Sequence, residues 1–325
     1  MAPDMIPPAG ATDFLTRQGW GGATILPLAG DASFRRYFRI VDGARRAVLM
    51  DAPPPHEDPR PFIEIAQWLG ARGFAAPKIH GIDLDQGLVL LEDFGDDRMR
   101  EAADADPSRE HALYGAAIDI LIALHAEDAV PAAPYDRAVL HREADLLVEW
   151  YCPAIGIDAD VESYHAAWDQ VFDEALAKRP VTVLRDYHAE NLMLTGAGLG
   201  LLDFQDALAG HAAYDLVSLL QDARRDVSPE LEATMLAYYL SHVGNDPGFD
   251  NAYHVLGAQR NAKIIGIFTR LWQRDGKPRY PTLCPRVWRY LDRDLAHPAL
   301  APVASWFDAT IPADKRGDPM VIAAA

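Results

Sequence analysis

Three polar residues in the middle of the sequence have the types and the spacing that phosphoryl transfer requires. Asp186 and Asn191 are five residues apart, and Asp203 follows twelve residues later, at the end of the apolar run 199–202. In a phosphoryl-transfer site one carboxylate orients the attacking hydroxyl and accepts its proton, while an amide oxygen and a second carboxylate hold Mg²⁺ on the phosphates. Carboxylate and carbonyl oxygens are the hard ligands that Mg²⁺ prefers. The three residues therefore indicate phosphoryl transfer.

The same aspartate–asparagine spacing occurs elsewhere in the chain and provides an internal comparison. Asp246 and Asn251 lie around a Pro-Gly pair, and Lys263 rather than an acid follows twelve residues later. We interpret this second pair as turn-forming residues of a solvated loop. The first pair differs because a β-branched run precedes it and an Asp-Phe pair follows it. Other nucleotide and hydrolase motifs are not found, since Gly276-Lys277 is followed by proline and the sequence has no G-x-S-x-G or H-E-x-x-H.

The first hundred residues predict a small β-rich lobe. Asp42-Gly43 between two apolar runs is a strong hairpin signal. Pro61 suits the first turn of a helix, and apolar residues recur at helical spacing after it. We expect this helix together with five strands, at residues 24–28, 34–41, 45–51, 78–83 and 88–94.

From Ser108 onward the pattern becomes predominantly helical. Apolar stripes predict helices over 113–124, 137–151 and 161–178, and again throughout the chain after Ala213. A β-branched run at 181–184 and a hairpin of 191–194 with 199–204 interrupt them, and this hairpin holds Asn191 and leads to Asp203. We place the boundary near Gly95, so the predicted class is α+β, with a small β-rich lobe at 1–95 and a larger α-rich lobe at 96–325.

Composition excludes several partners. The chain has 325 residues, of which 30 are Lys or Arg and 48 are Asp or Glu, a net charge of −18. Since nucleic-acid affinity comes largely from neutralising phosphates, we expect neither a nucleic-acid nor an anionic membrane partner. The two cysteines lack the spacing of a metal site or a disulfide framework. Residues 1–10 hold no basic residue and no apolar run, so we expect no signal peptide. We expect a cytoplasmic protein, and a monomer.

The motifs resemble those of one enzyme family. The segment Arg-Asp-Tyr-His-Ala-Glu-Asn at 185–191 is similar to the catalytic loop of protein kinases and aminoglycoside phosphotransferases, and Leu-Leu-Asp-Phe-Gln at 201–205 is similar to their metal-binding segment. Together with segments 30–37, 48–53 and 214–226, the set resembles the anomeric N-acetylmuramate/N-acetylglucosamine kinases of bacterial cell-wall recycling. The resemblance implies a protein-kinase-like bilobal fold with ATP bound between the lobes, the N-terminal lobe binding the nucleotide and the C-terminal lobe holding the catalytic loop and the substrate site.

The resemblance also implies roles for individual residues. Asp186 would be the catalytic base, and Asn191 and Asp203 the Mg²⁺ ligands. The nucleotide would be bound by the loop and hinge residues Gly30, Asp31, Ala32, Ser33, Phe34, Arg35, Glu92 and Phe94. The substrate side would involve His188, Glu190, Gln205, Arg224, Lys263 and Arg270, although His188 also suits a structural role.

One departure from the family pattern matters. Relatives carry a lysine on the third strand that contacts the α- and β-phosphates, yet Met50 stands at about that position, so Glu64 on the following helix lacks its usual partner. Two interpretations stay open: a nucleotide-binding pseudokinase without activity, or a kinase whose phosphates are held by Arg35, Arg36 or Arg39. We favour the second because the base and both metal ligands are intact.

The acceptor expected from the resemblance is N-acetylmuramate or N-acetylglucosamine, phosphorylated at the anomeric hydroxyl. A kinase for an aminoglycoside or a choline-type acceptor is the alternative. Residues 258–294 carry nine basic and three acidic residues, a local charge of +6. On a helix, Arg260, Lys263, Arg270 and Arg274 would lie within a sector of roughly 80°, bordered by apolar residues, where an arginine could bind the lactyl carboxylate of N-acetylmuramate. Arg224 and Arg225 are competing candidates for this role, and a solvated or ion-paired face is the simpler explanation.

Overall fold

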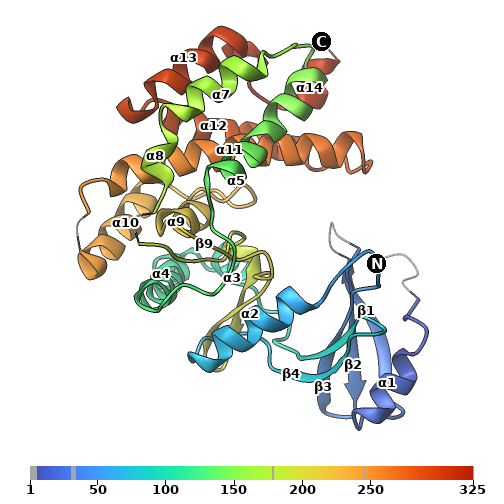
Figure 1. Cartoon of the computed structure of the whole chain (residues 1–325). Helices are drawn as coiled ribbons and strands as arrows, with labels where there is room; N and C mark the ends of the chain where they lie inside the picture. Colours follow the sequence, from blue (N-terminus) through green and yellow to red (C-terminus); the bar gives the residue numbers. More distant parts are fainter. Residues whose placement is uncertain (1–5, 31–33, 178, 245, 325) are drawn as a thin grey trace. The chain divides into compact units, whose positions relative to one another are not determined.

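The structure, a computed structural model, describes residues 6–30, 34–177, 179–244 and 246–324 and divides the chain into two compact units (Figure 1). Unit 1 comprises Met1–Pro107 and Glu190–Asp206, and unit 2 comprises Ser108–Ala189 and Ala207–Ala325. Unit 1 thus continues past residue 95, where the sequence analysis placed the lobe boundary, and takes in a second segment from the middle of the chain.

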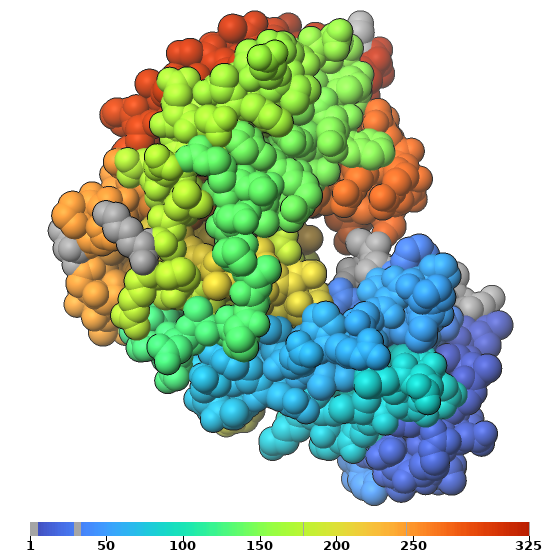
Figure 2. Space-filling model, in the orientation of Figure 1, coloured from blue at the N-terminus to red at the C-terminus, as the bar shows by residue number. Residues whose placement is uncertain are grey.

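Unit 1 is built on a five-stranded antiparallel sheet with the order β1-β2-β3-β5-β4. Its residues 6–30 and 34–95 are coloured from blue to cyan and lie together in the space-filling view (Figure 2). The hairpin at Asp42-Gly43 joins two strands in continuous register from Asp42↔Arg45 to Arg36↔Asp51. The strands are β1 (Thr24–Gly30), β2 (Arg36–Asp42), β3 (Arg45–Asp51), β4 (Ile79–Asp83) and β5 (Leu88–Glu92).

Two helices accompany this sheet, and the sequence analysis anticipated one of them, α2 (Arg60–Ala71). The other, α1 (Ala11–Arg17), packs against one face of the sheet. Its amphipathic pattern covers only seven residues, too few to predict a helix from periodicity. In the structure Phe14 and Leu15 are almost fully buried. The resulting core cluster consists of Ala11, Phe14, Leu15, Phe38, Ile40, Ala47, Leu49, Leu88 and Leu90.

A second hairpin explains why residues 190–206 belong to unit 1. Strands β7 (Leu192–Thr195) and β8 (Gly198–Leu201) pair with each other. The Leu194 N–H donates to the Asp97 carbonyl beside helix α3 (Met99–Ala105), and the Leu201 N–H donates to the Ala75 carbonyl. Phe204 stacks on Phe62 of α2 with ring centroids 5.1 Å apart. These contacts fix the chain on both sides of Asp203.

Unit 2 is helical apart from one short strand pair, β6 (Val181–Val183) with β9 (Leu208–Gly210). The α-helices are α4 (Glu110–Ala126), α5 (Arg137–Leu146), α6 (Cys152–Ala154), α7 (Val161–Asp169), α8 (Phe172–Ala175), α9 (Ala213–Leu220), α10 (Pro229–Val243), α11 (Phe249–Gln273), α12 (Cys284–Leu295), α13 (Ala301–Thr310) and α14 (Pro319–Ala323). A π-helical turn, η2 (Leu147–Tyr151), continues α5, and short 3₁₀ turns are η1 (Pro107–Arg109), η3 (Ala189–Asn191), η4 (Pro281–Leu283), η5 (Pro298–Leu300) and η6 (Ala313–Lys315).

Two helix predictions need correction. The helix expected over 161–178 breaks between α7 and α8, where Trp168 and Phe172 stack with centroids 5.1 Å apart inside the core. The helix expected over 137–151 widens into the π-turn η2 at Leu147. No proline or glycine marks the first break, so packing rather than local propensity decides it.

Helix α11 is the central element of unit 2 and contacts α5, η2, α8, α9 and α12 (Figure 1). Most of its residues are buried, including the polar Gln259, Arg260 and Asn261. Within the described ranges, no helix combines the length and the apolar character needed to cross a membrane.

Close packing of α11 on the end of α5 gives a stability prediction. A Cβ added at Gly266 would lie 2.3 Å from the backbone carbon and oxygen of Leu146. Gly266→Ala should therefore destabilise the protein by about 1–3 kcal/mol, the usual cost of overpacking. Gly115→Ala in α4 is the matched control, because nothing lies within 4 Å of its added Cβ. Alanine there should be neutral or favourable by up to about 1 kcal/mol. Equal melting temperatures for both variants would refute this close packing.

Candidate functional site

Asn191 and Asp203, the predicted metal ligands, lie together in unit 1. Asn191 precedes β7 and Asp203 follows β8, so the hairpin brings them to the same end, where the Leu202 N–H donates to the Asn191 carbonyl. The Asn191 amide Nδ2 is 3.4 Å from Asp203 Oδ2, and Gln205 Nε2 donates to Asp203 Oδ1 at 2.9 Å. A carboxylate and an amide side by side are a donor set that fits Mg²⁺. Gln205, predicted on the substrate side, contacts the predicted metal ligand instead.

Two residues, one in the predicted catalytic loop and one in the predicted metal-binding segment, have strained backbone conformations. Among the described residues other than glycine, Arg185 and Asp203 have positive φ angles, 71° and 59°. Such a conformation costs about 1–3 kcal/mol and is retained where the surroundings enforce it, often at active sites. One strained residue is a predicted Mg²⁺ ligand, and the other directly precedes the predicted base.

Asp186 lies in a loop of unit 2 that a buried carboxylate holds. Asp215 Oδ2 accepts the Leu184 N–H at 2.6 Å, and Asp215 Oδ1 accepts the Arg185 N–H at 2.9 Å. Ser218 Oγ donates to the Arg185 carbonyl at 3.1 Å. Burial raises the pKa of Asp215 to about 7, against the two N–H bonds, which lower it. The Asp186 side chain is half-buried. Asp215 and Ser218 of α9 therefore hold the backbone of this loop.

A buried ion-pair cluster lies next to this loop in unit 2. The Glu143 carboxylate pairs with Arg185 and accepts a hydrogen bond from the Tyr135 hydroxyl. Lys263 Nζ is 3.0 Å from the same carboxylate and donates to the Tyr214 hydroxyl at 3.2 Å. Although burial raises the pKa of Glu143, attraction from Lys263 and Arg185 outweighs it and lowers the pKa to about 2. Lys263 is thus held by Glu143 and Tyr214 within unit 2.

The other predicted basic residues of unit 2 have different environments. Arg224 Nη1 donates to His188 Nε2 at 3.3 Å, so this arginine lies beside the catalytic loop. Arg225 pairs with Glu110 at 2.6 Å and has a structural position. Arg260 is 4% exposed and donates to Ser218 Oγ at 2.7 Å. The expected basic face of α11 is therefore wrong at Arg260, because that side chain is a buried support of α9.

Arg270 differs from these residues. Its Nε is buried without a hydrogen-bond partner, and no ion pair to it occurs among the described residues. Burial, together with repulsion from Arg274, lowers the pKa of its guanidinium. An incoming anion would stabilise such a half-buried cation. Directly after the last residue of α11, Arg274 pairs with Asp275 at 2.7 Å.

The predicted nucleotide residues are partly described. Asp31, Ala32 and Ser33 lie outside the described residues, and Gly30 ends β1. Phe34 is exposed and stacks on His56 with centroids 5.3 Å apart. Arg35 is buried and lies 4.0 Å from both Glu57 and Asp203.

The predicted hinge at the end of β5 is held by side chains of unit 1. Glu92 forms a backbone hydrogen bond with Lys78 and accepts the Lys78 N–H with its carboxylate. Phe94 lies against Gly200 of β8, where an added Cβ would be 2.6 Å from its ring. Glu190, predicted on the substrate side, forms an ion pair with Arg100 in the same unit.

Sequence reasoning missed three acidic residues: Asp215, Glu143 and Glu57. Asp215 had a detectable signal, since it is the one charged residue in the apolar helix Ala213–Leu220. Glu143 and Glu57 gave no signal, because the residues that make them important come from distant parts of the chain.

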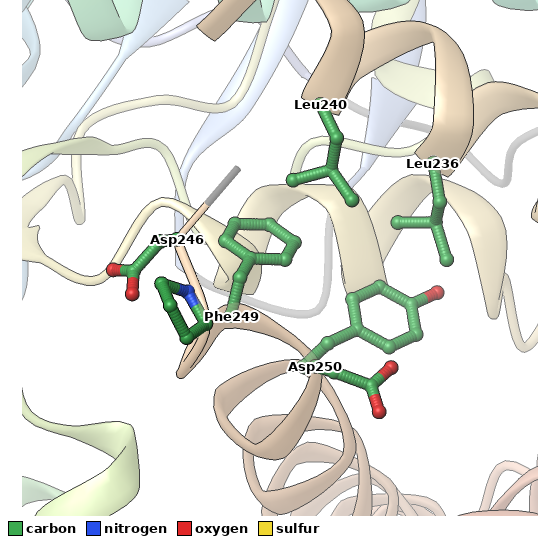
Figure 3. Close-up of a pocket in the computed structure, with 7 residues that line it drawn as sticks. Leu236, Leu240, Asp246, Phe249 and Asp250 are labelled. Atoms are coloured by element: carbon green, nitrogen blue, oxygen red, sulfur yellow. The ribbon is translucent and has the colours of Figure 1, made fainter. Parts of the chain in front are cut away.

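A separate cavity of about 240 Å³ opens between the end of α10 and the start of α11 (Figure 3). Its described lining is mainly apolar and contains none of the predicted site residues: Leu236, Leu240, Asp246, Pro247, Phe249, Asp250 and Tyr253. Asp246, of the second aspartate–asparagine pair, is exposed and accepts the Gly248 N–H. Asn251 lies in the first turn of α11 rather than in a loop.

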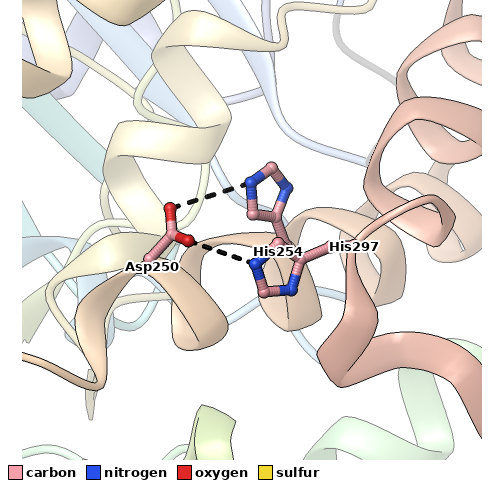
Figure 4. A group of neighbouring side chains, drawn as sticks. All are labelled: Asp250, His254 and His297. Carbon is pink, nitrogen blue, oxygen red and sulfur yellow. Dashed lines mark hydrogen bonds and ion pairs between the residues drawn. The ribbon is translucent and has the colours of Figure 1, made fainter.

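A second cluster combines Asp250, His254 and His297, whose potential ligand atoms lie within 4.8 Å of one another (Figure 4). Hydrogen bonds explain why these three side chains lie close together. His297 Nδ1 accepts the Ala299 N–H, so its Nε2 carries the proton and donates to Asp250 at 3.1 Å. His254 bonds to buried Asp294 at 2.9 Å; burial lowers the pKa of His254, but this bond raises it above the usual value. We interpret the cluster as a structural contact between α11 and η5.

Known proteins are similar to this chain over most of its length. The model of the phosphotransferase enzyme family matches residues 24–253. An N-acetylmuramate/N-acetylglucosamine kinase of Caulobacter vibrioides is 38% identical, over 93% of this chain and 96% of that protein. A protein of the same name from Pseudomonas aeruginosa is 39% identical, over 89% of this chain and 90% of that protein.

The chain therefore belongs to the phosphotransferase enzyme family and, within it, to the family of the N-acetylmuramate/N-acetylglucosamine kinases. The solved structure of an aminoglycoside phosphotransferase in its ADP-bound form is similar with a TM-score of 0.60 and 14% identity, covering 92% of this chain and 99% of that chain. At this identity the likeness concerns the fold alone. The predicted protein-kinase-like α+β fold is thus confirmed.

Proposed function

We propose that the protein transfers the γ-phosphoryl group of ATP to the anomeric hydroxyl of N-acetylmuramate and N-acetylglucosamine, in the cytoplasm, where ATP is available. The family membership supports the two acceptors, and the ADP-bound structure of similar fold supports an adenine nucleotide. The observation that carries the reaction type is the Asn191–Asp203 pair at the end of the β7–β8 hairpin, held in a strained backbone.

In this proposal Asp186 orients the anomeric hydroxyl and accepts its proton as the oxygen attacks the γ-phosphorus. An anomeric hydroxyl is more acidic than an ordinary alcohol, so correct positioning contributes more than base strength. Asn191 and Asp203 would hold Mg²⁺, which when bound neutralises charge on the phosphates. Gln205, bonded to Asp203, would orient that carboxylate. Asp215 keeps the loop before Asp186 in place through two backbone N–H groups.

A coupled assay of ADP release separates the proposal from its alternatives. N-Acetylmuramate and N-acetylglucosamine should both stimulate ADP formation, whereas an aminoglycoside and choline should not. Stimulation by choline or an aminoglycoside alone would favour the other acceptor classes. Nucleotide binding without turnover on any acceptor would favour the pseudokinase.

Arg270, whose Nε is buried without a hydrogen-bond partner, predicts a difference between the two sugars. If this residue binds the lactyl carboxylate, Arg270→Gln should raise KM for N-acetylmuramate by roughly fivefold or more, as expected for a lost bond to a charged group. N-Acetylglucosamine, which lacks the carboxylate, should be nearly unaffected. Lys263→Gln should raise KM for N-acetylmuramate by less than Arg270→Gln does, because Glu143 already holds Lys263. It should also lower the melting temperature, because it removes this buried ion pair.

Arg274→Gln is the matched control for this experiment, since Arg274 lies on the same predicted face but pairs with Asp275. It should leave KM for both sugars unchanged. Equal effects of Arg270→Gln on the two sugars, or no effect on either, would leave α11 with a purely structural role.

A further inference from the structure

At the position of Met50, the third strand offers no cation for a bound polyphosphate, since its two arginines, Arg45 and Arg46, lie at the far end of the strand. Met50 is fully buried on β3, and its neighbour Asp51 already binds Arg36 at 2.8 Å. In a chain with a net charge of −18, the triphosphate needs a local positive charge. Three arginines are candidates for this charge: Arg35 directly before β2, and Arg36 and Arg39 on β2.

Strand alternation separates Arg36 from Arg39. Side chains on one face of a sheet recur at every second residue. Tyr37 pairs with Met50 in the ladder, so Arg39 shares the face of Met50, whereas Arg35 directly precedes β2 and lies outside the ladder. Arg36 pairs with Asp51 and shares the opposite face with Phe38 and Leu49, which pack on α1. Arg36 therefore lies on the wrong side of the sheet.

Arg39 is on the correct face but is held elsewhere. Its guanidinium binds Asp93 at 2.7 Å and Asp96 at 2.9 Å, and it also donates to the Gly95 carbonyl. The hydrogen bond that Arg39 donates to Asp96 raises the pKa of Arg39, against burial, which lowers it. This arginine fixes the segment that follows β5.

Arg35 has the geometry of a phosphate-binding cation. Its Nη2 is 4.0 Å from Asp203 Oδ1, and its Nε is 4.0 Å from Glu57 Oε2, with the side chain 10% exposed. Glu57 is itself held, because its other oxygen accepts the Phe34 N–H at 3.1 Å. The guanidinium thus lies between a fixed carboxylate and the predicted Mg²⁺ ligand, all within unit 1.

We infer that Arg35 is the residue that binds the α- and β-phosphates of the nucleotide, in place of a lysine on β3, and that Glu57 positions it. The inference rests on the proposed function, since it assigns a role toward the proposed nucleotide. Arginine suits this role because its planar fork binds phosphate oxygens in pairs. Glu64, exposed on α2, has no part in the arrangement.

Calorimetric titration with Mg·ADP, together with KM for ATP, tests the inference on the full-length protein. Arg35→Gln should weaken Mg·ADP binding by about tenfold or more, as expected for a lost charge-assisted contact. Arg35→Lys, which keeps the charge, should retain more of the affinity. Arg36→Gln is the control on the opposite face and should leave Mg·ADP affinity unchanged at a temperature where all variants are folded.

The positioning role of Glu57 has its own matched pair. Glu57→Gln should raise KM for ATP several-fold with a smaller change in kcat, whereas Glu64→Gln should alter neither. The inference is overturned if the wild-type protein binds Mg·ADP and Arg35→Gln binds it equally well, or if Arg35→Gln and Arg36→Gln weaken it equally. A wild-type protein that does not bind Mg·ADP would instead refute the proposed function.

Discussion

Asp186→Asn should lower kcat by at least about 10²-fold, the usual contribution of a positioned acid–base group, because the amide keeps the shape of the side chain but cannot accept the proton. Steady-state kinetics with saturating ATP and N-acetylmuramate measure this effect. The fold should persist, since Asp215 and Ser218 hold the loop backbone. An unchanged melting temperature would verify that the loss is chemical.

Asp246→Asn is the natural control for this variant. Asp246 is five residues before Asn251, as Asp186 is before Asn191, but its side chain is exposed. It accepts the Gly248 N–H and lines the cavity between α10 and α11. Its replacement should leave kcat unchanged. If Asp186→Asn retained more than about a tenth of wild-type kcat, the assignment of the base would be wrong, since such groups contribute far more than tenfold.

Asp203→Ala should abolish the Mg²⁺-dependent part of nucleotide binding, whereas Asp206→Ala should leave most of it. Asp203 has a strained backbone and contacts Asn191, Gln205 and Arg35, while Asp206 is exposed three residues later. Titration of ADP with and without Mg²⁺ measures the difference directly. Equal loss of Mg·ADP affinity in the two variants would contradict the assignment of Asp203 as the ligand.

Local patterns in the sequence were sufficient to place most elements around these residues. The Asp42-Gly43 hairpin and the apolar runs on either side correspond to β2 and β3 in continuous register. The hairpin that carries Asn191 and Asp203 was visible because its strands flank a glycine-rich turn. The roles of these residues, and of Asp186, stay predictions until the variants are measured.

The parts that sequence reasoning missed depend on tertiary contacts. Helix α1 is only seven residues long, and its burial against the sheet, not its propensity, stabilises it. Arg260 and Arg270 occupy one predicted face of α11, yet Arg260 is bound to Ser218 and Arg270 has no described partner. Periodicity indicates which side of a helix a residue occupies, but not which residues of other helices meet it there.

The central claim is transfer of phosphate to the anomeric hydroxyl, and ³¹P NMR of the product formed from ATP, Mg²⁺ and N-acetylmuramate tests it most directly. The account predicts a new phosphomonoester signal that is split by the single anomeric proton H-1. A product signal split by two protons, as expected for phosphate on a primary hydroxyl, or release of inorganic phosphate alone, would contradict it.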